Sequence, residues 1–366
     1  MTSILAQQPA VAGATAGDLA SRLRSLTDAM RLDDFHYELP GHLIAQVPLE
    51  PRDSARLLVD RGPADPAHRH VRDLVAELGD GDVLVVNDSR VIPARLRLWR
   101  SSGGAAEVLL LEPLDGERRC WEALVRPAKK LRQGERLHAH DGSELIEVGQ
   151  RTDAGDTLAV TILGDGDPLQ RLMAFGEMPL PPYITVPLAD PDRYQTVYAS
   201  QPASAAAPTA GLHFTAPLLA QLAAQGVELL RVELVVGLDT FKPIDAADPR
   251  DHRIHSERFR VDAQVLERCR EARRVVAVGT TSVRALESAA SLGVSEGRTR
   301  LFIHRPYDWK VADLLITNFH LPRTTLLMMI DAFVGPRWRR LYEVALAEQY
   351  RFLSFGDAML LDRRAN

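Results

Sequence analysis

Six short β-like runs follow one another between residues 93 and 166, separated by turn-forming stretches such as SSGG, LDG, RQG and TDAGD. No helical period interrupts them, and short strands joined by tight turns are typical of a small antiparallel barrel. On both sides of this region the chain alternates apolar runs with helical periods, which is the pattern of an α/β domain. The sequence therefore predicts an α/β fold: a large, discontinuous α/β domain (residues 30–92 and 167–366) with a small antiparallel β-barrel domain inserted at residues 93–166.

The hydrophobic periods place the elements of the α/β part. Strands are predicted at residues 54–61, 82–88, 227–237, 274–279, 301–304, 313–319 and 351–361. Helices are predicted at residues 71–81, 167–176, 216–226, 262–273, 281–290, 324–334 and 337–350. The proline-rich residues 178–191 cannot continue a helix, because proline lacks the amide N–H, and we expect an extended arm there.

Charge and composition exclude several classes of protein. Residues 1–29 are Ala-rich and lack the basic-then-apolar order of a signal peptide, so we expect a disordered N-terminal extension. The longest apolar runs fall short of the roughly 20 residues of a membrane span. With 44 basic and 49 acidic side chains the net charge is -5, so contact with nucleic acid requires a local patch. Cys120 and Cys269 form no metal spacing and no disulfide framework, which favours a reducing cytoplasm.

A strand-turn-helix unit, VVAVGTTSVRALES (275–288), is a candidate anion site. It places Gly279, Thr280 and Thr281 at a helix N-terminus, where free backbone N–H groups and the helix dipole attract a carboxylate or phosphate. Arg284, one turn further along the helix, can add a positively charged guanidinium group to the site. The pattern alone is equally consistent with Thr281 as a plain N-cap and Arg284 as a surface residue.

A small-residue loop precedes the helix predicted at residues 216–226. Thr209, Gly211 and His213 lie in it, and Gly211 can adopt positive φ, so that a ligand can approach the backbone. A histidine exchanges its proton near neutral pH, which makes His213 a candidate acid or base. The alternative is a histidine that only packs under the start of the helix.

A second histidine follows an apolar strand. The segment DLLITNFHLPRTT delivers Asn318 and His320 to the carboxyl end of the strand predicted at residues 313–319. In open α/β sheets this end is where ligands bind. Asn318 and His320 are therefore candidate ligand-binding residues.

Basic residues gather in RPAKKLRQGER (126–136), which holds two of the four lysines of the chain. This run is either a solvated loop or a phosphate-binding surface, and on an acidic protein it is the best single candidate for contact with phosphates. Its candidate RNA-binding residues are Arg126, Lys129, Lys130 and Arg132.

Other kinds of site are disfavoured by the sequence. His252, His255 and Glu257 in DHRIHSE imitate a metal cluster, but they match no metal-ligand motif and no Cys pair accompanies them, so no metal is expected. The chain has neither G-x-G-x-x-G nor a P-loop motif, which argues against a standard dinucleotide site, the usual methyltransferase loop and a nucleotide triphosphatase.

Nine segments together resemble the QueA family of queuosine biosynthesis, the S-adenosylmethionine:tRNA ribosyltransferase-isomerases. They follow the family's order and cover nearly everything from Met30 onward. Ala203, Asp239 and Arg305-Pro306-Tyr307 depart from the family's pattern and concern the shapes of local loops. The segments are residues 32–59, 81–96, 121–131, 176–184, 193–199, 205–215, 278–287, 314–335 and 350–361.

The resemblance implies transfer and isomerisation of the ribosyl group of S-adenosylmethionine onto 7-aminomethyl-7-deazaguanine at the tRNA wobble position, with release of adenine and methionine. It implies that S-adenosylmethionine is consumed as cosubstrate and that no cofactor is used. We expect a monomer. His213 and His320 are then the expected acid and base. Alternatives are another S-adenosylmethionine-dependent tRNA-modifying transferase and a non-catalytic RNA-binding protein. The residues expected to bind S-adenosylmethionine are Thr209, Gly211, Gly279, Thr280, Thr281, Arg284 and Asn318.

Overall fold

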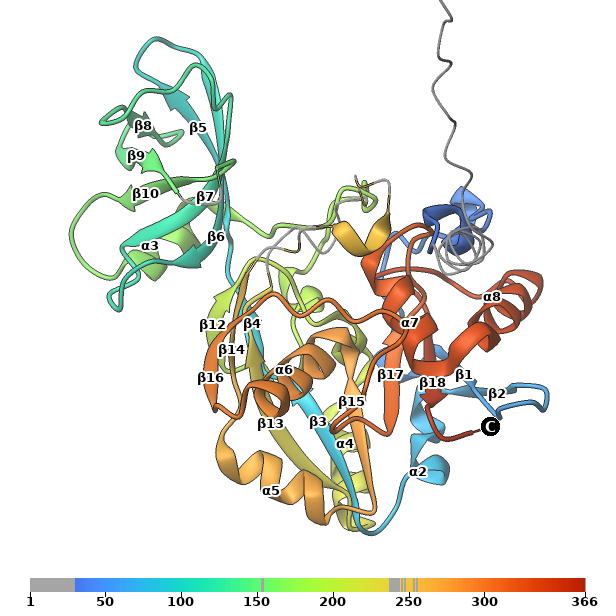
Figure 1. Cartoon of the computed structure of the whole chain (residues 1–366). Coiled ribbons are helices and arrows are strands. Elements are labelled where there is room, and N and C mark those ends of the chain that lie inside the picture. The colour runs from blue at the N-terminus through green and yellow to red at the C-terminus, as the bar shows by residue number, and fades with distance from the viewer. Residues whose placement is uncertain are drawn as a thin grey trace, which may run out of the picture.

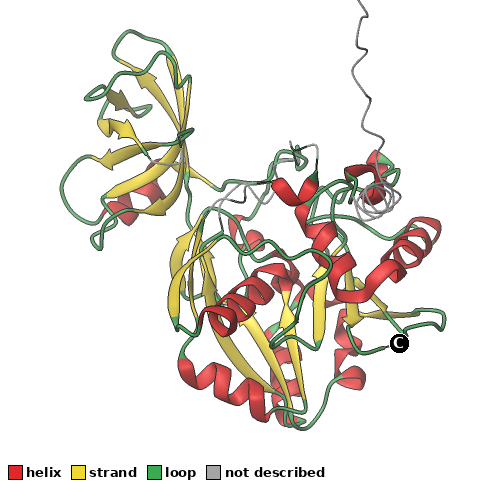
Figure 2. Ribbon diagram, viewed as in Figure 1, coloured by secondary structure: helices red, strands yellow, loops and turns green. Residues whose placement is uncertain are grey.

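The computed structural model describes residues 30–152, 155–236, 244, 246, 248–252, 254 and 256–365. The predicted N-terminal extension, Asp239 and His255 lie outside these residues. Figure 1 shows a large α/β body with a smaller β-domain beside it, and Figure 2 shows helices on both faces of the body's sheet. The predicted fold class, an α/β domain with an inserted antiparallel barrel, is confirmed.

A mixed sheet forms the centre of the body. In the described residues it has nine strands, and its centre, from β13 to β17, is parallel. β18 pairs antiparallel with β17 and parallel with β1, and antiparallel strands close both edges. The order across the sheet is β16 (Glu296–Thr299), β14 (Glu257–Arg260), β13 (Glu228–Leu234), β3 (Asp82–Asn87), β15 (Arg274–Val278), β17 (Leu314–Asn318), β18 (Ala358–Asp362), β1 (Arg56–Val59) and β2 (Ala67–His70).

Alternation along the central strands divides the body's core into two layers. Val83 and Val85 of β3 pack with α5, α6, α7 and α8 on one face. Leu84 and Val86 point the other way and pack with α2 and α4. A parallel sheet covered on both faces in this way needs apolar residues at every position, which is why β3 reads as a continuous hydrophobic run. The helices are α2 (Leu74–Glu77), α4 (Ala216–Ala224), α5 (Ala263–Glu271), α6 (Gly279–Leu292), α7 (Thr325–Val334) and α8 (Trp338–Ala347). The short 3-10 helices are η1 (Leu32–Phe35), η2 (Gly41–Leu43), η3 (Arg52–Ser54), η4 (Val71–Asp73), η5 (Pro191–Tyr194), η6 (Thr209–His213), η8 (Pro249–Asp251) and η9 (Gly335–Arg337).

The inserted domain is a closed barrel of six antiparallel strands, because β8 pairs with both β9 and β5. After the sixth strand the helix α3 (Pro168–Phe175) packs Leu172 into the barrel core. The two-residue strand β11 (Gly176–Glu177) then pairs with β5. The barrel strands are β5 (Arg95–Arg100), β6 (Ala105–Pro113), β7 (Cys120–Arg126), β8 (Arg136–His138), β9 (Glu144–Arg151) and β10 (Leu158–Ile162).

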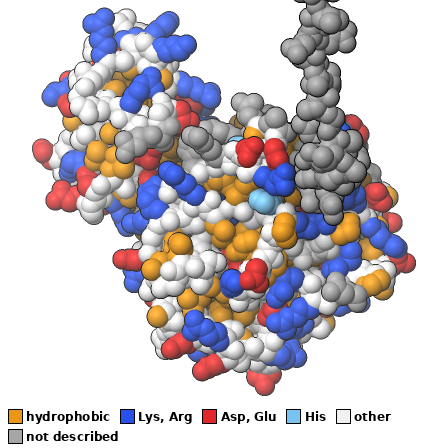
Figure 3. Space-filling model, viewed as in Figure 1, with side chains coloured by type: hydrophobic (Ala, Val, Ile, Leu, Met, Phe, Trp, Pro, Cys, Tyr) orange, Lys and Arg blue, Asp and Glu red, His pale blue; other side chains and the backbone are white. Residues whose placement is uncertain are grey.

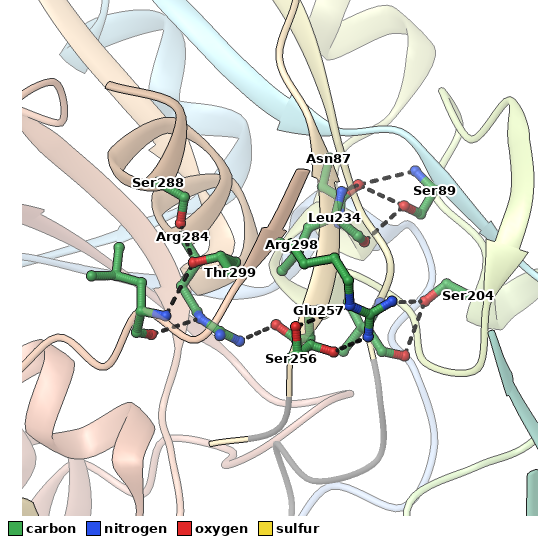
Figure 4. Close-up of polar contacts among 12 residues, drawn as sticks. Asn87, Ser89, Ser204, Leu234, Ser256, Glu257, Arg284, Ser288, Arg298 and Thr299 are labelled. Carbon is green, nitrogen blue, oxygen red and sulfur yellow. Dashed lines mark hydrogen bonds and ion pairs between the residues drawn. The ribbon is translucent and has the colours of Figure 1, made fainter. Parts of the chain in front are cut away.

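A short parallel pair, β4 (Ser89–Val91) and β12 (Gln201–Ser204), lies where the chain passes between body and barrel. Asn87, at the end of β3, stabilises this junction: its Nδ2 donates to Leu234 O at 3.0 Å and its Oδ1 accepts from the Ser89 hydroxyl at 2.8 Å. These contacts are drawn on the right of Figure 4. They hold the start of the barrel insertion against the end of β13.

Three element predictions are wrong in detail. Residues 301–304 form no strand, and the edge strand β16 lies just before them. The helix predicted at residues 71–81 is only η4 followed by the four-residue α2. The last strand is confined to β18, because the Asp357 carboxylate accepts from the backbone N–H groups of Arg56 and Arg351 and so folds the preceding residues into a loop. Each error lies at an edge of the sheet or in a loop, where long-range hydrogen bonds decide the backbone path.

Candidate active site

A hollow lies at the carboxyl ends of the neighbouring parallel strands β15 and β17, and holds about 640 Å³ of space, part of it open to solvent. Three segments far apart in the sequence meet there: the loop containing η6, the start of α6 and the end of β17. The residues predicted to bind a ligand that line this hollow are Thr209, Gly279, Thr280, Thr281, Asn318 and His320. The carboxyl ends of β15 and β17 thus border one hollow, at the edge of the sheet where ligands bind in open α/β folds.

The start of α6 leaves its first N–H groups without a side-chain cap. The N-cap position is Val278, which has no side-chain acceptor, and Gly279 begins the helix at φ +84°, a value that glycine adopts readily. Thr281 lies inside the helix, so it is not the N-cap. Its hydroxyl oxygen is buried and has no hydrogen-bond partner in the described chain. Free N–H groups beside a free hydroxyl make this end of the hollow suited to an anion.

His320 is held by its backbone and its ring. Its N–H donates to the Tyr342 hydroxyl at 3.0 Å, the Tyr37 hydroxyl donates to its carbonyl oxygen, and its Nε2 lies 2.9 Å from the Thr317 hydroxyl. Burial lowers the pKa of His320 from 6.5 to about 3. The ring facing the hollow is therefore neutral at physiological pH, able to accept or donate one hydrogen bond.

Asn318 joins three loops around the hollow. Its Oδ1 accepts from the Thr209 hydroxyl at 2.9 Å, and its Nδ2 donates to Leu353 O at 3.1 Å and, more weakly, to Asp357 O at 3.5 Å. Both polar atoms of the side chain are thus engaged by the protein. The geometry gives Asn318 a positioning role, with one lone pair of Oδ1 left for a ligand.

His213 and Gly211 do not line this hollow. The His213 ring is buried, with Nδ1 3.0 Å from Ala210 O and Nε2 2.9 Å from Gly356 O, so both nitrogens face backbone carbonyls. Gly211 does not have positive φ, and the predicted reason for this glycine is wrong. Its Cβ would lie 2.0 Å from the Tyr198 hydroxyl oxygen, so close packing requires the glycine.

Sequence reasoning missed Tyr183 and Ser354, which also line the hollow. Their hydroxyl oxygens lie 2.7 Å apart, and burial raises the pKa of Tyr183 to about 12. Tyr183 belongs to the proline-rich arm at residues 178–191. The segment 176–184 was among those that carry the family resemblance, and this was the available signal for it.

Arg284 lies in a second hollow, of about 800 Å³ including open space, between the body and the barrel. Its Nη1 forms an ion pair with Glu257, shown in Figure 4, and its Nε donates to Leu301 O at 3.3 Å. Glu112 and Glu122 reach the same hollow from the barrel. The structure thus separates Arg284 from Thr280 and Thr281, although all three lie within five residues.

The predicted RNA-binding loop is exposed at the barrel surface. Arg126, Lys129, Lys130 and Arg132 are all exposed, and none has an ion pair among the described residues. Glu135, the acidic residue of the run, pairs instead with Arg100 at 2.6 Å. Figure 3 shows Lys and Arg side chains gathered at the outer end of the barrel. This patch supplies the local positive charge that the net charge of the chain lacks.

Across the described ranges, no three His, Cys, Asp or Glu side chains cluster as a metal site, and His255 of the DHRIHSE segment lies outside them. No helix in the described part of the chain has both the length and the apolar character to span a bilayer.

Comparisons with known proteins agree with one another. The family model described as "Queuosine biosynthesis protein" matches residues 32–361. The S-adenosylmethionine:tRNA ribosyltransferase-isomerase of Symbiobacterium thermophilum is 50% identical over 343 residues, covering 91% of this chain and 100% of that protein. The protein of the same name from Rubrobacter xylanophilus is 50% identical over 336 residues, with 91% and 98% covered. A crystal structure of S-adenosylmethionine tRNA ribosyltransferase from Thermotoga maritima is 35% identical, covers 89% of this chain and 99% of that one, and superposes with a TM-score of 0.51.

Proposed function

The chain belongs to the queuosine-biosynthesis family of S-adenosylmethionine:tRNA ribosyltransferase-isomerases, and we propose that it transfers and isomerises the ribosyl group of S-adenosylmethionine onto 7-aminomethyl-7-deazaguanine at the wobble position of tRNA. Adenine and methionine leave, and epoxyqueuosine remains in the tRNA. The observation that carries the proposal is the hollow that joins an uncapped helix N-terminus to a buried neutral histidine.

The methionine carboxylate of the cosubstrate binds at the start of α6. The N–H groups of the first turn, which begins at Gly279, and the Thr281 hydroxyl supply donors there, and the helix dipole favours a negative charge. Thr280 lines the same wall. Binding at this end directs the sulfonium and ribose toward the end of β17.

His320 is the histidine that lines the hollow, and it is the proposed proton acceptor. The positive sulfonium acidifies the ribose carbon bonded to it, and a neutral imidazole can accept that proton where a cationic one cannot. The neutral ring is also compatible with the positive charge of the cosubstrate, which a histidinium would repel. His213 acts as a positioning residue, because it joins Ala210 to Gly356 behind the hollow.

The opened sugar is a reactive species that water must not reach. Tyr183, Phe319 and Leu353 contribute apolar surface to the walls of the hollow, and a cosubstrate bound between them displaces water from it. After adenine has left, the aminomethyl group of the tRNA attacks the sugar, and closure of the epoxide expels methionine.

The tRNA is held in part by the exposed loop with Arg126, Lys129, Lys130 and Arg132, through phosphate contacts. A monomer is the proposed active form. S-adenosylmethionine is consumed as cosubstrate, we expect no further cofactor, and the chain is proposed to act in the cytoplasm. Light scattering with and without tRNA tests the monomer.

The decisive experiment is a product analysis. The chain is incubated with S-adenosylmethionine and tRNA that carries 7-aminomethyl-7-deazaguanine. Adenine and methionine in equal amounts are expected. S-adenosylhomocysteine would indicate a methyltransferase, and tRNA binding without any product would indicate a non-catalytic RNA-binding protein.

A further inference from the structure

The hollow between body and barrel contains a buried donor that the protein does not use. Arg284 is only 8% exposed, and its Nη2 has no hydrogen-bond partner in the described residues. A buried charged donor without an acceptor destabilises the free protein. This destabilisation is removed if a ligand brings a carbonyl oxygen to Nη2.

Glu122 offers the complementary group from the barrel side of the same hollow. The hydroxyls of Thr152 and Thr157 both donate to its Oε1, at 3.0 and 2.5 Å. Its Oε2 makes no hydrogen bond with any described residue. The two threonines therefore fix the carboxylate and leave one oxygen as an acceptor for a ligand.

The charge of the hollow selects the kind of ligand. The described side chains around the hollow include three carboxylates, from Glu112, Glu122 and Glu257, and two guanidinium groups, from Arg284 and Arg298. Arg298 pairs with Glu112 at 2.6 Å. This excess of carboxylate among the described side chains favours a neutral or cationic group over a phosphate. Leu301, Phe302 and Ile303 form an apolar wall suited to a flat ring.

The two hollows adjoin each other. Leu326 lines both of them, and the consecutive residues Val235 and Val236 line one each. A ring bound beside Arg284 can thus extend a short substituent toward a cosubstrate bound at the start of α6. Reaction between them requires this proximity.

We propose that the hollow between body and barrel binds the 7-aminomethyl-7-deazaguanine ring of the tRNA, with Arg284 Nη2 donating to the ring carbonyl oxygen and Glu122 Oε2 accepting from the ring N–H and 2-amino group. The aminomethyl substituent then points past Leu326 to the ribose of S-adenosylmethionine. This inference rests on the proposed function. It makes Arg284 and Glu122 specificity residues for the base and assigns neither to S-adenosylmethionine.

The test uses the full chain and two anticodon stem-loop RNAs, one with 7-aminomethyl-7-deazaguanine at the wobble position and one with the analogue that lacks the 2-amino group. Fluorescence anisotropy measures both dissociation constants. The wild-type chain should bind the first RNA about tenfold tighter or more, since a charge-assisted hydrogen bond is lost with the analogue. Equal affinities would overturn the proposal whatever the variants do.

Glu122→Gln is the sharpest variant. The Thr152 and Thr157 hydroxyls, which also contact each other, favour the glutamine carbonyl at the Oε1 position, where both donate, and this places the NH₂ group at the Oε2 position. A donor then faces the donors of the base. The variant should lose the preference between the two RNAs, while its melting temperature and its affinity for S-adenosylmethionine stay at wild-type values. Glu117→Gln, in an exposed turn of the barrel, is the matched control and should keep the preference.

Arg284→Lys keeps a cation for Glu257 and removes the Nη2 donor. It should weaken the binding of both RNAs by about tenfold and leave the ratio of their dissociation constants unchanged, because both bases carry the ring carbonyl. Unchanged affinity in both Arg284→Lys and Glu122→Gln would overturn the inference. Release of adenine and methionine by the wild-type chain is measured alongside. If neither product appears, the proposed function is contradicted. If both appear but the two variants bind RNA as the wild-type chain does, only the assignment of the base to this hollow is contradicted.

Discussion

The hydroxyl of Thr209 donates to Oδ1 of Asn318 across 2.9 Å, and this bond joins the η6 loop to the end of β17, 109 residues further along the chain. Through Asn318 Nδ2 the same side chain is tied to the loop at Leu353. The shape of the hollow thus depends on one amide that three segments share. Thr209→Val keeps the shape of the side chain and removes the bond. We expect a loss of about 1 kcal/mol of stability and weaker binding of S-adenosylmethionine, measured by urea denaturation and calorimetry. A variant with wild-type values in both would show that Thr209 does not position Asn318.

Thr281→Val tests the proposed carboxylate site. The Thr281 hydroxyl oxygen is buried without a partner in the described chain, so its removal costs the free protein nothing in hydrogen bonding. The dissociation constant for S-adenosylmethionine should rise about tenfold, since one hydrogen bond to a charged group is lost. Thermal stability without ligand should not fall. A parallel fall in stability and affinity would instead indicate a structural role.

His320 makes the stability of the protein sensitive to acid. Its pKa is about 3 in the folded chain and about 6.5 in the unfolded chain, so between these values the unfolded chain binds more protons. The stability due to the neutral ring is complete above pH 6.5 and is lost as the pH falls toward 3. Between pH 7.5 and 5.5 the wild-type chain should lose about 1.4 kcal/mol more than His320→Gln. If urea denaturation showed the same loss of stability between the two pH values in the wild-type chain and in His320→Gln, the burial of the neutral ring would be contradicted.

His320→Gln should also slow single turnover by about 10² to 10⁴-fold if the ring transfers a proton, with little effect on the affinity for S-adenosylmethionine. His213→Gln is the comparison, because that ring faces backbone carbonyls outside the hollow. It should slow turnover much less. The reverse order of effects would transfer the catalytic role to His213.

The basic loop is tested by salt dependence. Neutralising Lys129, Lys130 and Arg132 together should weaken tRNA binding and reduce the slope of log affinity against log salt by about one for each lost phosphate contact. Affinity for S-adenosylmethionine serves as the control and should not change. An unaltered slope would mean that the loop is only a solvated face of the barrel.

Gly211 is tested through its neighbour. A methyl group there would meet the Tyr198 hydroxyl oxygen, so Gly211→Ala should destabilise the chain by about 2 kcal/mol through overpacking. Tyr198→Phe removes that oxygen, which has no hydrogen-bond partner among the described residues. The double variant should therefore recover part of the loss in thermal denaturation. No recovery would point to Thr196, the other side chain near this position.

Features that depend on neighbouring residues could be predicted from the sequence alone. The six barrel strands follow from short apolar runs and tight turns, and the buried strands β3, β15 and β17 follow from apolar runs of the right length. The rule that ligands bind at the carboxyl ends of parallel strands makes candidates of the glycine and threonines at the start of α6 and of His320 after β17. Secondary structure and the position of loops at strand ends are set within one or two turns of chain.

Contacts between distant segments were decided only by the tertiary structure. His213 and His320 both follow suitable loops, yet of these two only His320 lines the hollow. The His213 ring is instead held against the carbonyl oxygen of Gly356, 143 residues away. Arg284 is one turn from Thr281, yet the pairing of β14 with β13 brings Glu257 to it and turns it toward the barrel. Side-chain direction at these positions depends on which strands pair and which loops pack together. No local pattern encodes that choice, since it is made by contacts between residues 27 positions apart for Glu257 and Arg284 and 143 positions apart for His213 and Gly356.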